Sequence, residues 1–168
     1  MVLEAWFFIA AALLLVSGGS KFVDPAPTRG ALQATGLPAF DWAVYLIGTA
    51  EIAAALTGTV LGGWTSLGVA LTYLGFAGFV AYALLRRIPL QSCGCFGKAD
   101  TPPTWGHLVF NVVSAGVAIG VAVTGTEPLG ILAGQPLGAV PYLAFVAIGV
   151  WVVYLLLTEL PRLRSLMT

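Results

Sequence analysis

Residues 64–85 have the sequence WTSLGVALTYLGFAGFVAYALL, a stretch of apolar and small residues without a single charged side chain. About 20 consecutive apolar residues are needed to cross the hydrocarbon core of a bilayer as an α-helix. The stretch therefore predicts a transmembrane helix. Similar stretches before and after it predict four more, so we expect five spans, over residues 2–18, 41–61, 64–85, 104–124 and 138–158.

The composition of the whole chain supports this fold class. Of the 168 residues, 59% are apolar and 8% are charged, whereas soluble domains are about 45–50% apolar and about 25% charged. We expect an all-α, polytopic membrane bundle that forms one integral membrane domain over residues 1–168, in contact with the lipid bilayer. No cluster of basic residues is longer than Arg86-Arg87, which argues against nucleic acid as a partner.

Glycine and proline residues set the expected limits of the spans. We expect Ser17-Gly18-Gly19 to end the first helix and Gly62-Gly63 to form a tight reversal between the second and third. Residues 125–137 are expected to form either a re-entrant segment or a plain loop. No basic residue precedes the first apolar stretch and no cleavage site follows it, so we expect a retained helix and not a signal peptide.

Small residues four positions apart are expected to bring helices together. Lipid provides no hydrophobic driving force for helix association, so close packing over small side chains has to supply it. The pairs Gly58/Gly62 and Gly116/Gly120 have this spacing. We expect them to serve general helix packing and not a specific dimer contact.

The basic residues predict which side of the membrane each loop faces, because Lys and Arg prefer the cytoplasmic side. With five spans, all seven basic residues fall in the first loop, the third loop or the C-terminal tail, which lie on one side. We therefore expect the N-terminus outside the cell membrane and the third loop in the cytoplasm. The seven residues are Lys21, Arg29, Arg86, Arg87, Lys98, Arg162 and Arg164.

Two cysteines, Cys93 and Cys95, stand in the third loop in the sequence Ser92-Cys-Gly-Cys-Phe-Gly97. Thiols separated by one residue can bind a soft metal ion or close into a strained disulfide, which is easily reduced and suits thiol exchange. A structural disulfide is not favoured, since it would close almost no loop. A structural zinc site would need four ligands, and only His107 lies nearby. The spacing predicts a catalytic thiol pair or, alternatively, a two-thiolate metal site.

Glu51 lies near the middle of the second predicted span. A carboxylate at that depth is costly, so we expect it to face the bundle interior, to stay largely neutral and to be a candidate functional residue. An equally good alternative is a structural role, in which a protonated Glu51 joins two helices by a hydrogen bond.

His107, Asn111 and Ser114 follow one another at helical spacing in the fourth span. Residues three and four apart lie on the same face of a helix, so we expect a polar stripe that runs from the cysteine loop into the membrane. Such a stripe can stabilise a thiolate or pass a proton. It can equally provide ordinary hydrogen bonds between helices.

These motifs resemble those of the DoxX-like membrane proteins, and of their MauE branch, which is named for methylamine utilisation. The segment Ser17-Gly-Gly-Ser-Lys21-Phe-Val-Asp-Pro25 looks like the end of the first helix in that family. Gly36-Leu-Pro38, followed by Glu51, looks like the start of the second. Cys93-Gly-Cys-Phe-Gly97, with His107 and Asn111 downstream, resembles the MauE pattern. The resemblance as a whole covers about residues 5–120.

The resemblance implies a four-helix core, to which the fifth span is added, and a role in redox chemistry. MauE-like proteins are thought to help thioredoxin-like partners form or maintain disulfides in exported proteins. Cys93 and Cys95 would then exchange electrons, with Glu51, His107, Asn111 and Lys21 as polar support. The chain departs from the family pattern at Phe110-Asn111, where an Arg-Asn pair is expected, so any role of that Arg is missing here.

An export-side role would place the cysteines outside, whereas the basic residues place them in the cytoplasm. Electrons that pass from a cytoplasmic thiol donor would reconcile the two expectations. The sequence thus favours a membrane thiol–disulfide oxidoreductase with a thioredoxin-like partner.

Two other functions stay open. One is a transporter or chaperone for mercury(II) or copper(I) that uses the same cysteine pair, although the only methionines are Met1 and Met167. The other is a scaffolding membrane subunit with dispensable cysteines. The sequence leaves the cofactor undecided, since a quinone is compatible with the chemistry but no motif identifies a quinone site.

Overall fold

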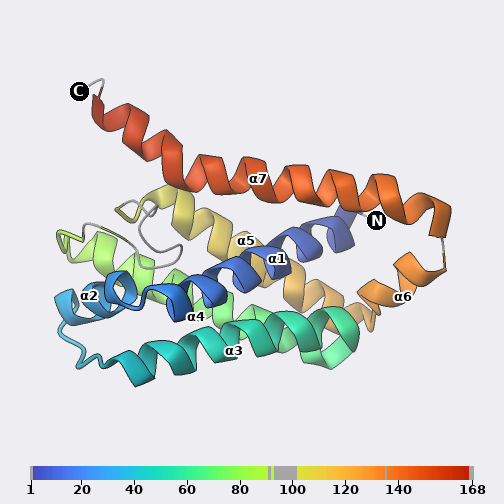
Figure 1. Cartoon of the computed structure of the whole chain (residues 1–168), viewed down its shortest axis with the longest axis horizontal. Helices are drawn as coiled ribbons and strands as arrows, with labels where there is room; N and C mark the ends of the chain where they lie inside the picture. The colour runs from blue at the N-terminus through green and yellow to red at the C-terminus, as the bar shows by residue number, and fades with distance from the viewer. Residues whose placement is uncertain (1, 91, 93–101, 135, 167–168) are drawn as a thin grey trace.

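The computed structural model describes residues 2–90, 92, 102–134 and 136–166, and over these residues the chain forms helices and no strands (Figure 1). Five of the helices are long and apolar enough to cross a membrane, as expected for a polytopic helical bundle. They are α1 (Val2–Val23), α3 (Asp41–Val60), α4 (Ser66–Leu85), α5 (Trp105–Thr124) and α7 (Pro136–Leu166). The shorter elements are α2 (Ala26–Ala34), the 3-10 turn η1 (Gly63–Thr65) and α6 (Pro128–Ala133).

Helices α1, α3, α4 and α5 form the core of the bundle. The most extensive contacts join α4 to α5 and α1 to α3, and α1 also packs against α5. Phe7 of α1 is completely buried among small and branched side chains from the other three helices, among them Ala55, Val69 and Ala118. Small residues let these backbones approach closely, which drives helix association where lipid offers no hydrophobic gain.

Helix α7 lies along one side of this core, beside α1 (Figure 1). Only 11% of its most apolar stretch is buried, against 50% for α1. Val146 of α7 is buried against Ile9 and Leu13 of α1. The expected arrangement of a four-helix core with an added fifth helix is therefore what the structure shows.

The first span is longer than the sequence predicts. It was expected to end at Ser17-Gly18-Gly19, but α1 continues to Val23 and stops just before Pro25. Glycine is tolerated inside membrane helices because neighbouring helices and internal hydrogen bonds support the backbone. Proline, which disfavours the helical conformation of the residue before it, ends α1 instead. The extension places Lys21 inside the helix.

The close contact between α1 and α3 explains why both helices carry a glycine here, Gly18 in α1 and Gly48 in α3. A Cβ atom added to Gly18 would lie 2.8 Å from the carbonyl oxygen of Gly48, and one added to Gly48 would lie 2.9 Å from that of Gly18. Any side chain at either position would push α1 and α3 apart. Gly116, in contrast, meets no atom within 4 Å, so the expectation that the Gly116/Gly120 pair joins helices is wrong at Gly116.

The reversal between α3 and α4 forms where the sequence places it. Gly62 and Gly63 adopt positive φ angles of 62° and 50°, a conformation that residues with a side chain rarely adopt. The Gly63 N–H donates to the carbonyl oxygen of Thr126, 2.9 Å away, which ties this turn to the segment after α5. That segment contains α6, whose length is too short to cross a bilayer.

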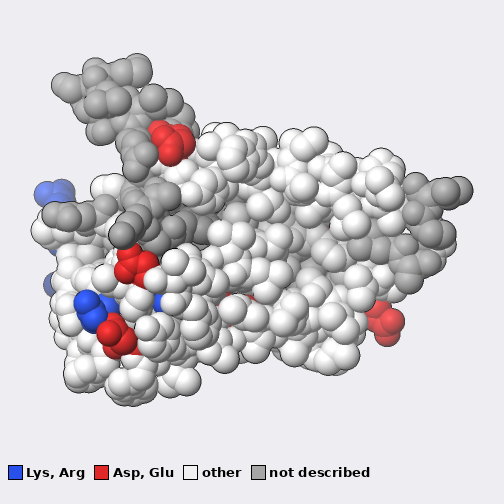
Figure 2. Space-filling view, in the orientation of Figure 1, with Lys and Arg blue, Asp and Glu red and all other residues white. Residues whose placement is uncertain are grey.

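Basic side chains gather at one end of the molecule. The basic groups in view in Figure 2 lie at the end that holds α2 and the C-terminal end of α4. Arg29 of α2 forms an exposed ion pair with Asp41 at the start of α3. Lys21, which was expected in the first loop, is instead 1% exposed within α1. Lys21 is therefore not one of the basic loop residues from which the orientation is predicted.

Candidate functional site

A buried ion pair joins α1 to α3 in the interior of the bundle. The Lys21 ammonium lies 2.9 Å from Glu51 Oε1 and donates a hydrogen bond to Glu51 Oε2 at 3.1 Å. It also donates to the hydroxyl of Ser17 at 2.9 Å and to the Ser17 carbonyl oxygen at 3.3 Å. All of the ammonium's hydrogen-bonding capacity is thus satisfied within the protein, as a buried charge requires.

The expectation that Glu51 faces other helices is confirmed, because its side chain is 0% exposed. The sequence also predicts a largely neutral carboxyl, since ionising a lone carboxyl in a low dielectric is unfavourable. With the Lys21 ammonium in contact, both groups can be ionised with no net charge, and burial of an ion pair costs far less than burial of a lone charge. The possible roles of Glu51 are therefore those of a carboxylate that is paired with a cation.

The polar stripe on α5 is also buried. His107, Asn111 and Ser114 are 3%, 6% and 0% exposed and face the other helices. The indole N–H of Trp6, on α1, donates to the Ser114 hydroxyl at 3.2 Å. This hydrogen bond links the deep end of the stripe to α1. The helical spacing therefore predicts correctly that the three side chains share an inward face.

His107 belongs to the first turn of α5. Its Nδ1 atom accepts a hydrogen bond from the Thr104 N–H at 3.3 Å and lies 2.9 Å from the Thr104 hydroxyl. Thr104 and His107 thus form a capping box at the start of the helix, with His in the place where Glu or Gln is usual. Because Nδ1 accepts from the backbone, a neutral His107 carries its proton on Nε2.

A small cavity of about 20 Å³ separates the ion pair from the polar stripe. Ser17, which holds Lys21, lines it on one side, and His107 and Asn111 line it on another. A volume of this size with several polar partners has room for about one water molecule. The ring of Phe76 completes the wall on the side of the ion pair, with its centre 5.7 Å from the Lys21 ammonium.

Cys93 and Cys95, the predicted thiol pair, lie outside the residues that the structure describes. In the sequence they precede Thr104, which caps α5, by a short segment. Among the residues that the structure describes, no group of three or more His, Cys, Asp or Glu side chains is arranged to hold a metal ion. The two-thiolate alternative therefore concerns the cysteines themselves.

Sequence reasoning missed three residues that organise this site. The sequence pattern places Ser17 at a helix end, although a hydroxyl four residues before Lys21 on one helix indicates a contact between the two side chains. Trp6 and Thr104 were not considered. Thr104 carried a recognisable pattern, because a Thr three residues before a polar side chain at a helix start is typical of a capping box.

A comparison with models of protein families matches residues 1–124 to the family described as methylamine utilisation protein MauE. The match covers α1 to α5 and ends at the last residue of α5. Helix α7, which lies at the side of the core, falls outside it. No curated protein and no solved structure matches the chain.

Proposed function

Because the chain belongs to the MauE family of multi-pass membrane proteins, we propose that it is a membrane thiol–disulfide redox protein. In this proposal the whole chain acts as one membrane domain. Cys93 and Cys95 exchange electrons with a thioredoxin-like partner and so support disulfide formation in, or maturation of, exported proteins.

The observation that carries the proposal is the polar system in the core. Within apolar helices, the chain buries His107 and Asn111 at one small cavity, and Ser17, which lines the same cavity, holds the buried Lys21–Glu51 pair. Buried charges in membrane spans are costly and commonly serve transport or proton transfer. His107 and Asn111 lie in α5, which begins shortly after the cysteine loop, and Lys21 lies in α1, which packs against α5. Oxidation of thiols in that loop requires protons to move.

The exchange involves two electrons and two protons. Two thiols of the partner lose them as its disulfide forms, and the disulfide between Cys93 and Cys95 accepts them and opens to two thiols. The attacking sulfur is a thiolate, so a nearby base assists each step. His107 and Glu51 are the groups that we assign to proton transfer on the protein side.

We also propose an orientation. The basic residues other than Lys21 still fall in the first loop, the third loop and the C-terminal tail, so the N-terminus is placed outside and the cysteine loop in the cytoplasm. Electrons then pass between the cysteine pair and a thiol carrier on the cytoplasmic side.

The test is to trap the mixed disulfide. Cys93→Ser and Cys95→Ser variants are expressed in cells, free thiols are blocked rapidly, and membrane extracts are separated without reductant. One of the two variants should accumulate a covalent complex with a thioredoxin-like protein, since the missing second thiol cannot resolve it.

The double variant, which lacks both thiols, is the control and should form no such complex. Ser92→Ala, which alters the neighbouring hydroxyl and keeps both thiols, should behave as the unmodified chain. If both single variants support full activity and neither traps a partner, the redox proposal is wrong.

A further inference from the structure

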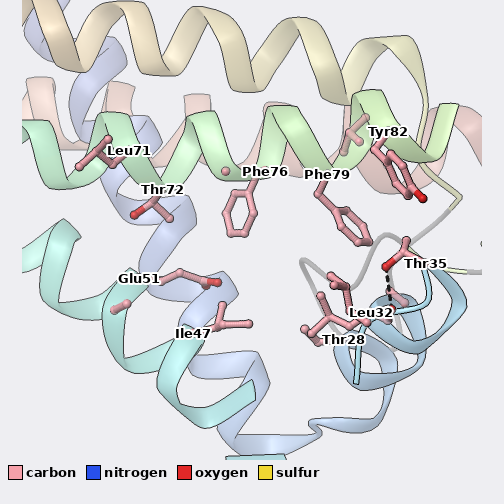
Figure 3. A pocket seen from close by; sticks show the side chains of 15 residues that line it. Thr28, Leu32, Thr35, Ile47, Glu51, Leu71, Thr72, Phe76, Phe79 and Tyr82 are labelled. Atoms are coloured by element: carbon pink, nitrogen blue, oxygen red, sulfur yellow. Dashed lines mark hydrogen bonds between the residues drawn. The ribbon is translucent and has the colours of Figure 1, made fainter. Parts of the chain in front are cut away.

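A groove of about 620 Å³ opens between α2, α3 and α4 (Figure 3). Leu71 and Leu37, which line it, are 69% and 53% exposed, and its two long walls belong to helices that cross the membrane. Exposed apolar side chains on such helices face lipid. A molecule that fills the groove from this side therefore enters it from the bilayer.

The groove is about as long as one leaflet of a bilayer is thick. Its lining on α4 begins at Leu71 and ends at Tyr82, eleven residues further along the helix. At a rise of about 1.5 Å per residue this length is about 16 Å, and half of the hydrocarbon core is about 15 Å thick. Figure 3 shows Leu71 at one end of the groove and Tyr82 at the other, with Phe76 and Phe79 between them. A groove of this length accommodates one acyl chain.

The polar groups of the lining are engaged within the protein. The Thr72 hydroxyl donates to the Gly68 carbonyl oxygen at 2.8 Å, and the Thr35 hydroxyl donates to a backbone carbonyl oxygen of α2 at 2.6 Å. Glu51 is 0% exposed and its carboxylate is held by Lys21 of α1, so it presents no charge to the groove. A hydrocarbon chain can therefore lie against Thr72 and Thr35 without depriving either hydroxyl of its acceptor.

Contacts with two neighbours hold α2, the third wall of the groove, in place. Arg29 of α2 forms an ion pair with Asp41 at the start of α3. Ala31, also in α2, is buried in one apolar cluster with Ala83, which lies near the C-terminal end of α4. The position of α2 is therefore set by both of the helices that form the long walls.

Two arginines follow the groove at its surface end. Arg86 and Arg87 come directly after the last residue of α4, and both are exposed. The Arg86 guanidinium lies over the ring of Tyr82, 5.9 Å from its centre, and Tyr82 is the last residue of α4 in the lining. Neither arginine forms an ion pair with a residue that the structure describes. The groove thus ends at positive charge that the described part of the chain does not neutralise.

We propose that this groove binds an anionic phospholipid. One acyl chain lies in the groove against Phe76 and Phe79, and the phosphate lies beside Arg86 and Arg87 at the membrane surface. Arginine binds phosphate oxygens through charge-assisted hydrogen bonds, and basic pockets between membrane helices bind anionic lipid headgroups. The groove provides the apolar length and the arginines provide the charge, and both lie in the described part of the chain.

A zwitterionic phospholipid fits this site less well. It offers the same acyl chain and a phosphate, but its headgroup also carries a cation, which the two arginines repel. Each arginine near the membrane surface should favour the anionic lipid by about fivefold, so the two together should favour it by about thirtyfold. The net charge of the lipid therefore distinguishes specific binding from simple filling of the groove by hydrocarbon.

The test uses two probe lipids, phosphatidylglycerol and phosphatidylcholine, that carry a diazirine at the end of the same acyl chain. The full chain is purified into nanodiscs of phosphatidylcholine that contain one probe at the same trace mole fraction. After irradiation, covalent adducts are located by mass spectrometry of peptides. The phosphatidylglycerol probe should give about thirtyfold more adduct on the α3 and α4 residues that line the groove. Unlabelled phosphatidylglycerol should compete with it.

Two glycines of α4 offer a matched pair of variants for the groove itself. Gly75 lines the groove and Gly78 does not, and a Cβ atom added at either position meets no atom within 4 Å. Gly75→Leu should fill the groove and lower the adduct yield of the phosphatidylglycerol probe at least about tenfold. Gly78→Leu should leave that yield unchanged.

Variants of the two arginines test the charge. Arg86→Gln should lower the adduct yield of the phosphatidylglycerol probe about fivefold, and Arg86→Gln together with Arg87→Gln should lower it about thirtyfold. The yield of the phosphatidylcholine probe should not fall in either variant. Arg86→Lys keeps the charge and should retain most of the yield. Both arginines are exposed, so these variants should fold as the unmodified chain does, whatever Gly75→Leu does to the bundle.

Four results would overturn the proposal: adducts spread over the lipid-facing surface, equal yields for the two probes, an unchanged yield in Gly75→Leu, or an unchanged yield in the double arginine variant. Equal yields would identify the groove as a site for acyl chains without regard to the headgroup. The binding needs neither cysteine, so the Cys93→Ser, Cys95→Ser double variant should give the same adducts. The proposed redox function can therefore fail without affecting this result.

Discussion

Removal of the Glu51 carboxylate should destabilise the bundle far more than removal of an exposed charge. In the Glu51→Ala variant, the Lys21 ammonium keeps only its two contacts with Ser17 and stays 1% exposed. A buried charge without its counter-charge is strongly unfavourable, because the protein interior solvates it poorly. Glu51→Gln should cost less than Glu51→Ala, since the amide oxygen can still accept a hydrogen bond from Lys21.

The geometry sets the size of the effect. Two unit charges 2.9 Å apart attract each other by about 6 kcal/mol at an effective dielectric constant of about 20. Much of this offsets the cost of taking both charges out of water. The expected loss in the free energy of unfolding for Glu51→Ala is therefore about 3–5 kcal/mol, as for other buried pairs from which one partner is removed.

The measurement is unfolding of the purified chain in mixed micelles, with SDS as the denaturant and tryptophan fluorescence as the signal. Lys21→Met should cost about as much as Glu51→Ala. The double variant Lys21→Met, Glu51→Ala should recover at least about 2 kcal/mol relative to the sum of the single changes, because it leaves no unpaired charge. Asp41→Ala is the control, since its exposed pair with Arg29 should contribute less than about 1 kcal/mol.

The result that refutes this reasoning is additivity. If the two single changes and the double change differ from the unmodified chain by amounts that simply add, Lys21 and Glu51 do not stabilise each other. The same holds if Glu51→Ala costs no more than Asp41→Ala.

Two further predictions concern helix packing and orientation. Gly48→Ala should lower the unfolding free energy by about 1–3 kcal/mol, because its Cβ would lie 2.9 Å from the Gly18 carbonyl oxygen; Gly116→Ala, whose Cβ meets open space, should change it by less than about 1 kcal/mol in the same assay. A membrane-impermeant maleimide should label Cys93 and Cys95 in permeabilised, reduced cells and not in intact ones, and labelling in intact cells would reverse the proposed orientation.

Much of the fold follows from local sequence patterns. The limits of α3, α4 and α5 lie within about a residue or two of the predicted spans, since hydropathy and length alone decide which segments cross a bilayer. The turn at Gly62-Gly63 was predictable for a similar reason, because few other residues adopt its backbone conformation. The inward face of α5 followed from helical spacing.

The error at the end of α1 shows where local patterns fail. Gly18-Gly19 indicates a helix end in a soluble protein, but here Gly18 lies against Gly48 of α3 and lets the two helices touch. Whether a glycine breaks a helix or permits a close contact depends on what lies beside it. That neighbour is remote in the sequence, so no local pattern identifies it.

By itself, the sequence determined that this is a membrane protein of five apolar helices, that Glu51 had to be buried, and that His107, Asn111 and Ser114 share a face. These conclusions depend on transfer energies and helical periodicity, which are local properties of the chain. Only the tertiary structure decided that Lys21 pairs with Glu51, that Trp6 bonds to Ser114, and that α2, α3 and α4 enclose a groove. Each of these depends on the depth and rotation at which helices pack, and packing is set by the shapes of side chains that the chain brings together from distant positions.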